Sequence, residues 1–133
     1  MAGLLRSVSA IRIFTHNLER ARQFYAGMLE LDEQSAEPDY VTFDLAGVDI
    51  VIERVAPDDP EATRLVGRFL AASFSVDNIV EVCRELAERG VSLLQPPEKQ
   101  EWGGTLAFLC DPDDNVITLV EYPPVVAPSS VRY

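Results

Sequence analysis

The chain has 133 residues, of which 47% are hydrophobic and 25% charged, a composition typical of one globular domain or of two half-domains that share a core. Its formal net charge of −11 argues against nucleic acid as a partner, because binding to phosphates requires a basic surface. The same charge argues against an anionic membrane surface, and no apolar run approaches the ~20 residues that a membrane-spanning helix needs.

The first half of the chain is predicted to form a strand, a helix and three further strands. Apolar and polar side chains alternate over 9–15, which indicates a strand that ends shortly before Asn17, a favourable N-cap for the helix. The helix carries an apolar stripe at helical spacing that consists of Leu18, Ala21, Phe24, Tyr25 and Met28. The further strands are expected over 31–36, 40–45 and 48–55, the last two joined as a hairpin.

The second half repeats this order after 56–68, a segment whose prolines and charged residues predict a linker. A strand is expected first, followed by a helix that Asn78 caps and that Gly90 ends in the left-handed conformation. The strands of this half are expected over 70–76, 91–95, 105–110 and 115–122, with a longer loop over 96–103. The last segment, 123–133, is predicted to be a loosely ordered tail or to pack on a partner subunit.

Two stretches of the first half correspond to stretches of the second half. Residues 14–18 match 75–79, and residues 43–53 match 108–118. A unit of one strand, one helix and three strands cannot close a core alone, so two copies are expected to pack on each other. We therefore predict an α+β fold of two βαβββ modules, 1–55 and 69–122. Their strands are expected to form a curved, mixed and mostly antiparallel eight-stranded sheet around a cavity, with the helices outside.

These features resemble the vicinal oxygen chelate superfamily, the group of glyoxalases, bleomycin resistance proteins and extradiol dioxygenases. The resemblance rests on the segments 17–25, 74–78, 102–104 and 111–115, and it extends from about Val8 to Tyr122. The chain departs from the family at Glu30 and Asp114, where the family usually has glycine.

The resemblance also bears on metal binding, because many members hold a divalent ion with a histidine and a carboxylate from each module. The corresponding residues here are Ala10, Glu53, Ala71 and Thr118. One carboxylate and one hydroxyl cannot compete with water for zinc, nickel or iron, since a catalytic site needs about three protein ligands. We therefore predict that the chain binds no metal. No glycine loop opens a helix as a nucleotide site requires, and no other cofactor is expected.

Glu53 is the main candidate for a functional residue. By analogy with the family, its side of the strand faces the cavity. Arg12 and Phe14 share one face of the first strand, so Arg12 is the expected partner of Glu53. The pair could be a plain salt bridge or could anchor a polar group of a ligand. Catalysis by Glu53 as a base is the third possibility, and binding is favoured over it because no second acid or base is evident nearby.

Trp102 precedes two glycines in the longer loop, where its ring could belong to the core or stack on a ligand at the rim of the cavity; we favour the second. The only histidine, His16, is expected at a solvated corner rather than in the site. The predicted ligand-binding residues are Arg12, Phe14, Thr42, Asp44, Glu53, Ser73, Ser75, Trp102 and Thr118.

The sequence thus favours a small-molecule binding or sequestering protein, similar to the bleomycin resistance members and independent of metal. The alternatives are a lyase, isomerase or dioxygenase-like enzyme that uses Glu53, with or without a divalent ion, and a regulatory module with a vestigial cavity. The acidic charge serves solubility first, and attraction of a cationic ligand is the secondary hypothesis. The resemblance implies a homodimer. Two cysteines and the lack of a signal-peptide pattern predict a reduced, cytoplasmic protein.

Overall fold

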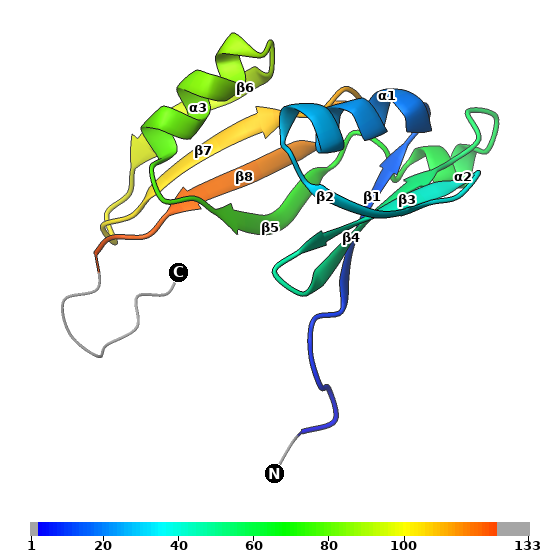
Figure 1. The fold of residues 1–133 in the computed structure, drawn as a ribbon, viewed down its shortest axis with the longest axis horizontal. Helices are drawn as coiled ribbons and strands as arrows, with labels where there is room; N and C mark the ends of the chain where they lie inside the picture. Colours follow the sequence, from blue (N-terminus) through cyan, green and yellow to red (C-terminus); the bar gives the residue numbers. More distant parts are fainter. Residues whose placement is uncertain (1–2, 125–133) are drawn as a thin grey trace. The chain divides into compact units, whose positions relative to one another are not determined.

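The computed structural model describes residues 3–124, and the chain divides into two compact units between Gly67 and Arg68. Each unit contains one four-stranded mixed sheet (Figure 1). The predicted α+β class and the two βαβββ modules are confirmed, with the eight strands hydrogen-bonded as two sheets of four. Most of the predicted tail, 125–133, lies outside the described residues.

The first module begins with a strand and a helix of mixed type. Its elements are β1 (Ala10–Thr15), α1 (Leu18–Arg22), the π-helical η1 (Gln23–Met28), β2 (Asp32–Ala36), β3 (Tyr40–Leu45) and β4 (Val48–Arg54). The strand order is β1-β4-β3-β2, with β1 parallel to β4. The Asn17 side chain caps α1 by accepting a hydrogen bond of 3.0 Å from the N–H of Arg20, as predicted.

The second module has the same order of elements and the same arrangement of strands. Its elements are β5 (Phe69–Ser75), α3 (Ile79–Glu88), β6 (Ser92–Lys99), β7 (Thr105–Cys110) and β8 (Val116–Glu121). The strand order is β5-β8-β7-β6, with β5 parallel to β8. The Asn78 side chain accepts from the N–H of Glu81 at 3.1 Å, and Gly90 follows the helix with φ +90°, so both predicted ends of α3 are confirmed.

The sequence prediction was wrong about the end of β6. Pro96 and Pro97 were expected in a loop, but the strand continues through them to Lys99. In its sheet β6 is an outer strand that pairs with β7 alone, and a proline is tolerated there because the missing N–H can face the unpaired side. The register also shifts between Gln95 and Glu98, around the two prolines.

The predicted linker, 56–68, contains a short helix, α2 (Pro60–Thr63). The Asp59 carboxylate caps it by accepting hydrogen bonds of 3.1 and 3.2 Å from the N–H groups of Glu61 and Ala62. A proline at the first helical position is favourable, because its missing N–H has no partner there in any case. The segment is therefore ordered by its own local hydrogen bonds.

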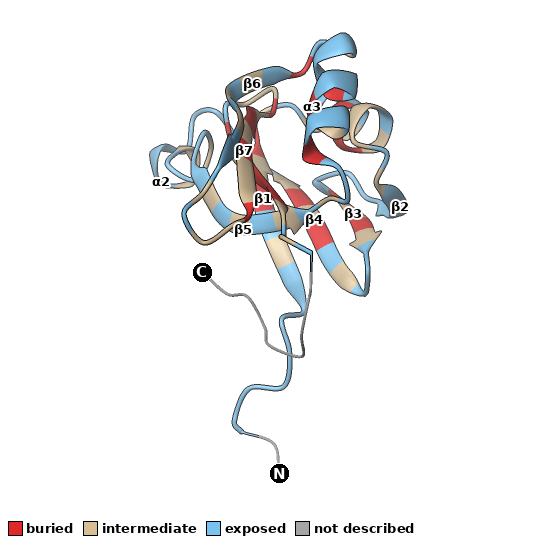
Figure 2. Cartoon of the chain, turned by 90° about the vertical axis from the view of Figure 1, so that its left-hand side faces the viewer, coloured by how far each residue is buried: buried red, intermediate tan, exposed pale blue. Residues whose placement is uncertain are grey.

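In each module the helix covers one face of the sheet. Helix α1 packs on β3 and β4, and α3 packs on β6, β7 and β8. More and less buried residues alternate along most strands, as Figure 2 shows in red against blue and tan, whereas 117–120 of β8 are all buried. Strand residues buried under the helices include Val41, Phe43, Ile50, Ile52, Ala107 and Leu109. We call the side of each sheet that faces away from its helix the open face.

Within residues 3–124, every helix is too short or too polar to cross a lipid bilayer.

Candidate functional site

Arg12 and Glu53 form a two-pronged ion pair on the open face of the first sheet. Arg12 Nε donates to Glu53 Oε2 over 2.5 Å, and Arg12 Nη2 donates to Oε1 over 3.0 Å. The pair is diagonal across two parallel strands, because Arg12 is in register with Val51 and Glu53 is in register with Phe14. The expected partnership is thus present, with the Arg12 side chain 62% exposed and that of Glu53 27% exposed.

The carboxylate of Glu53 also fixes the charge of its partner. The hydrogen bonds from Arg12 to Glu53, together with the attraction between the two charges, raise the pKa of Arg12 above its ordinary value. The guanidinium is therefore always protonated, and it offers a planar set of N–H donors that matches the two carboxylate oxygens.

Two aromatic residues flank Glu53. Phe14 on β1 and Tyr40 on β3 are its cross-strand neighbours on either side. The Arg12 guanidinium carbon lies 5.2 Å from the centroid of the Phe14 ring, within the range of a cation–π interaction. Tyr40 is 41% exposed and is not among the residues predicted from the sequence. The face thus combines a carboxylate, a stacked cation and an accessible phenol.

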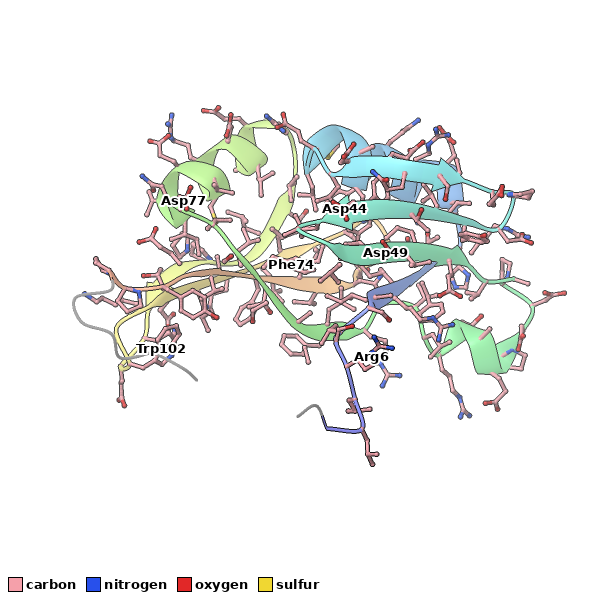
Figure 3. All side chains as sticks on the ribbon, turned by 60° about the horizontal axis from the view of Figure 1, so that its bottom comes forward. Arg6, Asp44, Asp49, Phe74, Asp77 and Trp102 are labelled. Carbon is pink, nitrogen blue, oxygen red and sulfur yellow. The ribbon has the colours of Figure 1, made fainter. Side chains whose placement is uncertain are left out.

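Three aspartates lie in one row near the other end of this face. Asp49 on β4 is in register with Asp44 on β3, and Asp44 is in register with Asp32 on β2. Figure 3 labels Asp44 and Asp49 on their adjacent strands. Like charges directly opposite each other destabilise a sheet, and together they attract cations.

Between this row and Glu53 lies a row of the same face in which Arg12 on β1 is followed by neutral side chains on the other strands. Thr42 is in register with Val51, and its hydroxyl shares a hydrogen bond of 2.7 Å with the hydroxyl of Ser35. The open face of the first sheet therefore brings together five of the predicted site residues, which are Arg12, Phe14, Thr42, Asp44 and Glu53.

Three other predicted residues lie on the open face of the second sheet. Ser73 on β5 is in register with Thr118 on β8, and Ser75 is in register with Val120. Thr118 is only 5% exposed, and its neighbour on β7 is Phe108. This part of the face is more apolar than its counterpart in the first module.

Trp102 closes the turn between β6 and β7. A Cβ atom at position 104 would lie 2.1 Å from Trp102 Cζ3, so the indole ring covers Gly104 directly. The ring also lies 6.0 Å from that of Tyr122, centroid to centroid. Trp102, labelled in Figure 3, is therefore placed at the turn beside the end of β8.

The remaining reactive side chains have structural surroundings. His16 Nδ1 lies 3.3 Å from the carbonyl oxygen of Val55, at the corner where the sequence placed it. Burial raises the pKa of the Cys83 thiol. Burial also raises the pKa of Cys110, and the nearby carboxylates of Asp114 and Asp111 raise it further. Both cysteines are therefore thiols at neutral pH, which are poor nucleophiles.

The residues at the family's metal positions do not fit a divalent ion. Ala10 has no ligand atom, and it is in register with Asp49 rather than with Glu53. In the second module Ser73, not Ala71, is in register with Thr118. Among residues 3–124 no group of three or more histidine, cysteine, aspartate or glutamate side chains is arranged to hold a metal ion.

Comparison with known proteins gives one family. The model of the glyoxalase/bleomycin resistance protein/dioxygenase superfamily matches residues 7–119. A solved structure of a member of this superfamily from Sphaerobacter thermophilus is 28% identical, covers 90% of this chain and 99% of that chain, and gives a TM-score of 0.73. No curated protein matches the chain.

Two more distant structures show the same fold. A glyoxalase-related enzyme from Fulvimarina pelagi is 20% identical over 97% of this chain and 99% of that chain, with a TM-score of 0.70. A lactoylglutathione lyase from Agrobacterium tumefaciens is 16% identical over 86% of this chain and 92% of that chain, with a TM-score of 0.71.

Proposed function

The chain belongs to the glyoxalase/bleomycin resistance protein/dioxygenase superfamily, and from this premise we propose that it binds a small molecule without the help of a metal ion. The observation that carries the proposal is the Arg12–Glu53 pair on the open face of the first sheet. A carboxylate between two aromatic residues is a suitable anchor for a polar group attached to a flat apolar body.

Independence from metal follows from the chemistry of the available donors. Alanine at positions 10 and 71 supplies no ligand atom, and a threonine hydroxyl is a weak ligand for zinc, nickel or iron. Glu53 is already engaged by a guanidinium. A binding role uses these residues as they are, whereas a metal-dependent reaction would need ligands from elsewhere.

The charge of the face favours a cationic ligand. Asp32, Asp44 and Asp49 lie in one row, while the charge of Glu53 is balanced by Arg12. The whole chain carries a formal net charge of −11, which adds a long-range attraction for cations. These charges favour a cationic ligand over an anionic one. We place its cationic group at Glu53, because Phe14 and Tyr40 flank this carboxylate, and extend the rest of the ligand over the open face.

The alternative function is a lyase or isomerase that uses Glu53 as a base, as the enzymes among the structural relatives suggest. A general base must be free to accept a proton from the substrate. Both oxygens of Glu53 accept hydrogen bonds from Arg12, so this pair would have to open before any proton transfer. Binding of a cation only replaces Arg12 by another positive group, whereas a general base needs an unpaired carboxylate, so we favour binding over catalysis.

A thermal-shift screen tests the proposal. Cationic aromatic drugs and glycopeptides form one panel, and anionic aromatic compounds of similar size form the other. A ligand at 100 times its dissociation constant should stabilise the protein by about 2.7 kcal/mol. We expect hits in the cationic panel, and we expect Glu53→Gln to remove their effect.

The matched control is Glu33→Gln. Glu33 also forms a two-pronged ion pair, with Arg22, but this pair joins α1 to β2 and is not on the open face. Glu33→Gln should lower the basal melting temperature and leave the ligand-induced shift unchanged. Hits confined to anionic compounds, or shifts that persist in Glu53→Gln, contradict the proposal. A stoichiometric transition metal in protein purified without chelators contradicts its metal independence.

A further inference from the structure

The carboxylate of Glu53 is already occupied by a planar cation of the chain itself. The Arg12 guanidinium meets it with two N–H donors and lies over the ring of Phe14. These are the contacts that a carboxylate beside an aromatic ring would offer to a guanidinium or amidinium from outside. The arrangement therefore shows which kind of group fits this place.

We propose that Arg12 is a resident competitor, and that a ligand with a guanidinium or amidinium group binds by displacing Arg12 from Glu53. This inference rests on the proposed function, because it concerns the same carboxylate. It adds the chemical class of the ligand and a built-in competitor. Removal of Arg12 should then strengthen the binding of such a ligand, which is the opposite of the effect expected for a residue that contacts the ligand.

The two partners differ in how firmly they are held. Glu53 lies on β4, an inner strand between β1 and β3, and its side chain is 27% exposed. Arg12 lies on β1, an outer strand in the order of this sheet, and its side chain is 62% exposed. Ion pairs that are exposed in this way contribute little to stability, because water competes with them and ordering a long side chain costs entropy.

The displaced arginine has a second carboxylate within reach. Arg12 is in register with Val51, so Asp49 and Glu53 are its two diagonal neighbours on β4, one on each side along the strand. Diagonal neighbours on one face are separated by ~7–8 Å, a span that a long side chain can bridge. In the part of the chain that the structure describes, no hydrogen bond or ion pair engages the Asp49 side chain. Arg12 can therefore exchange Glu53 for Asp49 without losing its charge partner.

The geometry also selects among cations. A guanidinium or amidinium presents parallel N–H donors in one plane, which match the two oxygens of Glu53 and stack flat on Phe14. An ammonium group is a compact point charge, strongly hydrated, and it cannot reproduce this contact. Tyr40, on the other side of Glu53, can then contact an aromatic body attached to the cation.

The size of the effect follows from competition within one chain. A group on a short tether has an effective concentration of about millimolar. A free guanidinium must outcompete Arg12 at that concentration in the wild-type protein, but it meets an open carboxylate once Arg12 is removed. Because an exposed ion pair is only a few times more populated than its open form, we expect the affinity to rise by about two- to sixfold in Arg12→Ala.

The test uses methylguanidinium, which carries the end group of arginine, with methylammonium as the matched cation that lacks parallel donors. Both are titrated into wild type, Arg12→Ala and Arg12→Gln, and binding is followed by NMR shifts of the backbone amides. We expect both variants to bind methylguanidinium about two- to sixfold more tightly than wild type, with shifts centred on 12–14 and 51–53. Arg22→Ala, which removes the ion pair with Glu33, should bind like wild type.

Two further variants separate this inference from the proposed function. Asp49→Asn should weaken binding when Arg12 is present and have no effect in the Arg12→Ala background. Glu53→Gln should abolish binding in either background. If Arg12→Ala and Arg12→Gln fold but bind methylguanidinium no better than wild type, the displacement is wrong, and the Glu53-dependent binding of larger ligands still stands. If binding is unaffected by Glu53→Gln, both proposals fail.

Discussion

The two modules share a chain path but differ in the chemistry of their open faces. Both sheets place the first strand parallel to the last, with the helix on one side. The open face of the first sheet carries the ion pair of Arg12 and Glu53, whereas in the second sheet Thr118 lies between Ser73 and Phe108. Because side chains alternate along a strand, the helix-covered core can stay constant while the open face changes. In the first sheet the fold therefore constrains mainly the helix-covered half of each strand, whereas β8 of the second sheet is buried on both faces.

The modules also differ in how they close their last hairpin. In the first, β3 and β4 are joined by Ala46 and Gly47, both with positive φ, as a tight two-residue turn requires. In the second, Asp111 Oδ1 accepts hydrogen bonds from the N–H groups of Asp113 (2.8 Å) and Asn115 (2.9 Å). Asp111 and Asn115 are 4% and 0% exposed. The second module thus depends on a buried polar network where the first uses backbone conformation alone.

Among the variants that test the difference between the modules, removal of this network should change the free energy of unfolding most. Asp111→Ala leaves the N–H groups of Asp113 and Asn115 and the Asn115 amide without their acceptor, and each buried unsatisfied group costs about 1–3 kcal/mol. We expect a loss of about 3 kcal/mol in the free energy of unfolding, measured with urea.

The control for this prediction is Asp58→Ala, which removes an exposed aspartate of the connecting segment and should change stability by less than about 0.5 kcal/mol. In Asp111→Ala the Asn115 side chain would no longer be held in place. Its contact with the start of β5, where it accepts a hydrogen bond of 3.0 Å from the N–H of Arg68, would then weaken as well. Equal stabilities of the two variants would mean that the hairpins of the two modules do not differ in the way described.

A glycine in each module offers the next test. In the second module, Gly104→Ala places a Cβ 2.1 Å from Trp102 Cζ3 and 3.0 Å from the carbonyl oxygen of Glu121, so the indole must move. Overpacking of this kind costs about 1–3 kcal/mol. Trp102 is the only tryptophan, so its fluorescence reports the displacement directly.

In the first module, the Cβ added by Gly27→Ala meets nothing within 4 Å, and this variant should stabilise the helical segment by up to about 1 kcal/mol.

The residue that follows each helical segment in the left-handed conformation is a glutamate in the first module and a glycine in the second. Substitution at these two positions tests what the side chain costs there. Glu30 adopts φ +60° after η1, whereas Gly90 adopts φ +90° after α3. The left-handed conformation costs a side chain about 1–2 kcal/mol relative to glycine. We therefore expect Glu30→Gly to raise, and Gly90→Ala to lower, the free energy of unfolding by about 1 kcal/mol each. Changes of the same sign in both variants would contradict this explanation.

Much of the fold could be predicted because local signals agreed with one another. Asn17 and Asn78 marked the starts of both helices, and Gly90 marked the end of the second. The π-helical turn of η1 and the passage of β6 through Pro96 were not predicted. The path of β6 depends on which strand becomes an outer strand of the sheet, which is a property of the tertiary structure.

The site was predicted in part. The Arg12–Glu53 pair followed from strand alternation, but Tyr40 and Asp49 were not selected. The signal for them was present in the sequence, because a two-residue hairpin fixes the register and places Tyr40 opposite Glu53 and Asp44 opposite Asp49. The pairing of Thr118 with Ser73 could not be read in the same way, since the register of β5 shifts between Phe69 and Ser73.

The smallest expected effect concerns how α1 is attached to its sheet. Arg22 joins α1 to Glu33 of β2 by two hydrogen bonds of 2.7 Å, and these bonds hold the pKa of Glu33 below its ordinary value of 4.5. A carboxyl group whose pKa falls on folding stabilises the folded state above its ordinary pKa and loses that contribution as the pH falls through its folded value. The stability difference between wild type and Glu33→Gln should therefore be constant above about pH 5.5 and shrink steadily below about pH 4.5. In the second module, the Glu121 carboxylate instead accepts a hydrogen bond of 2.8 Å from the N–H of Ile79 at the start of α3. A difference between wild type and Glu33→Gln that does not change between pH 3 and pH 7 would mean that Arg22 and Glu33 are not paired in solution, and that α1 is held to its sheet by packing alone.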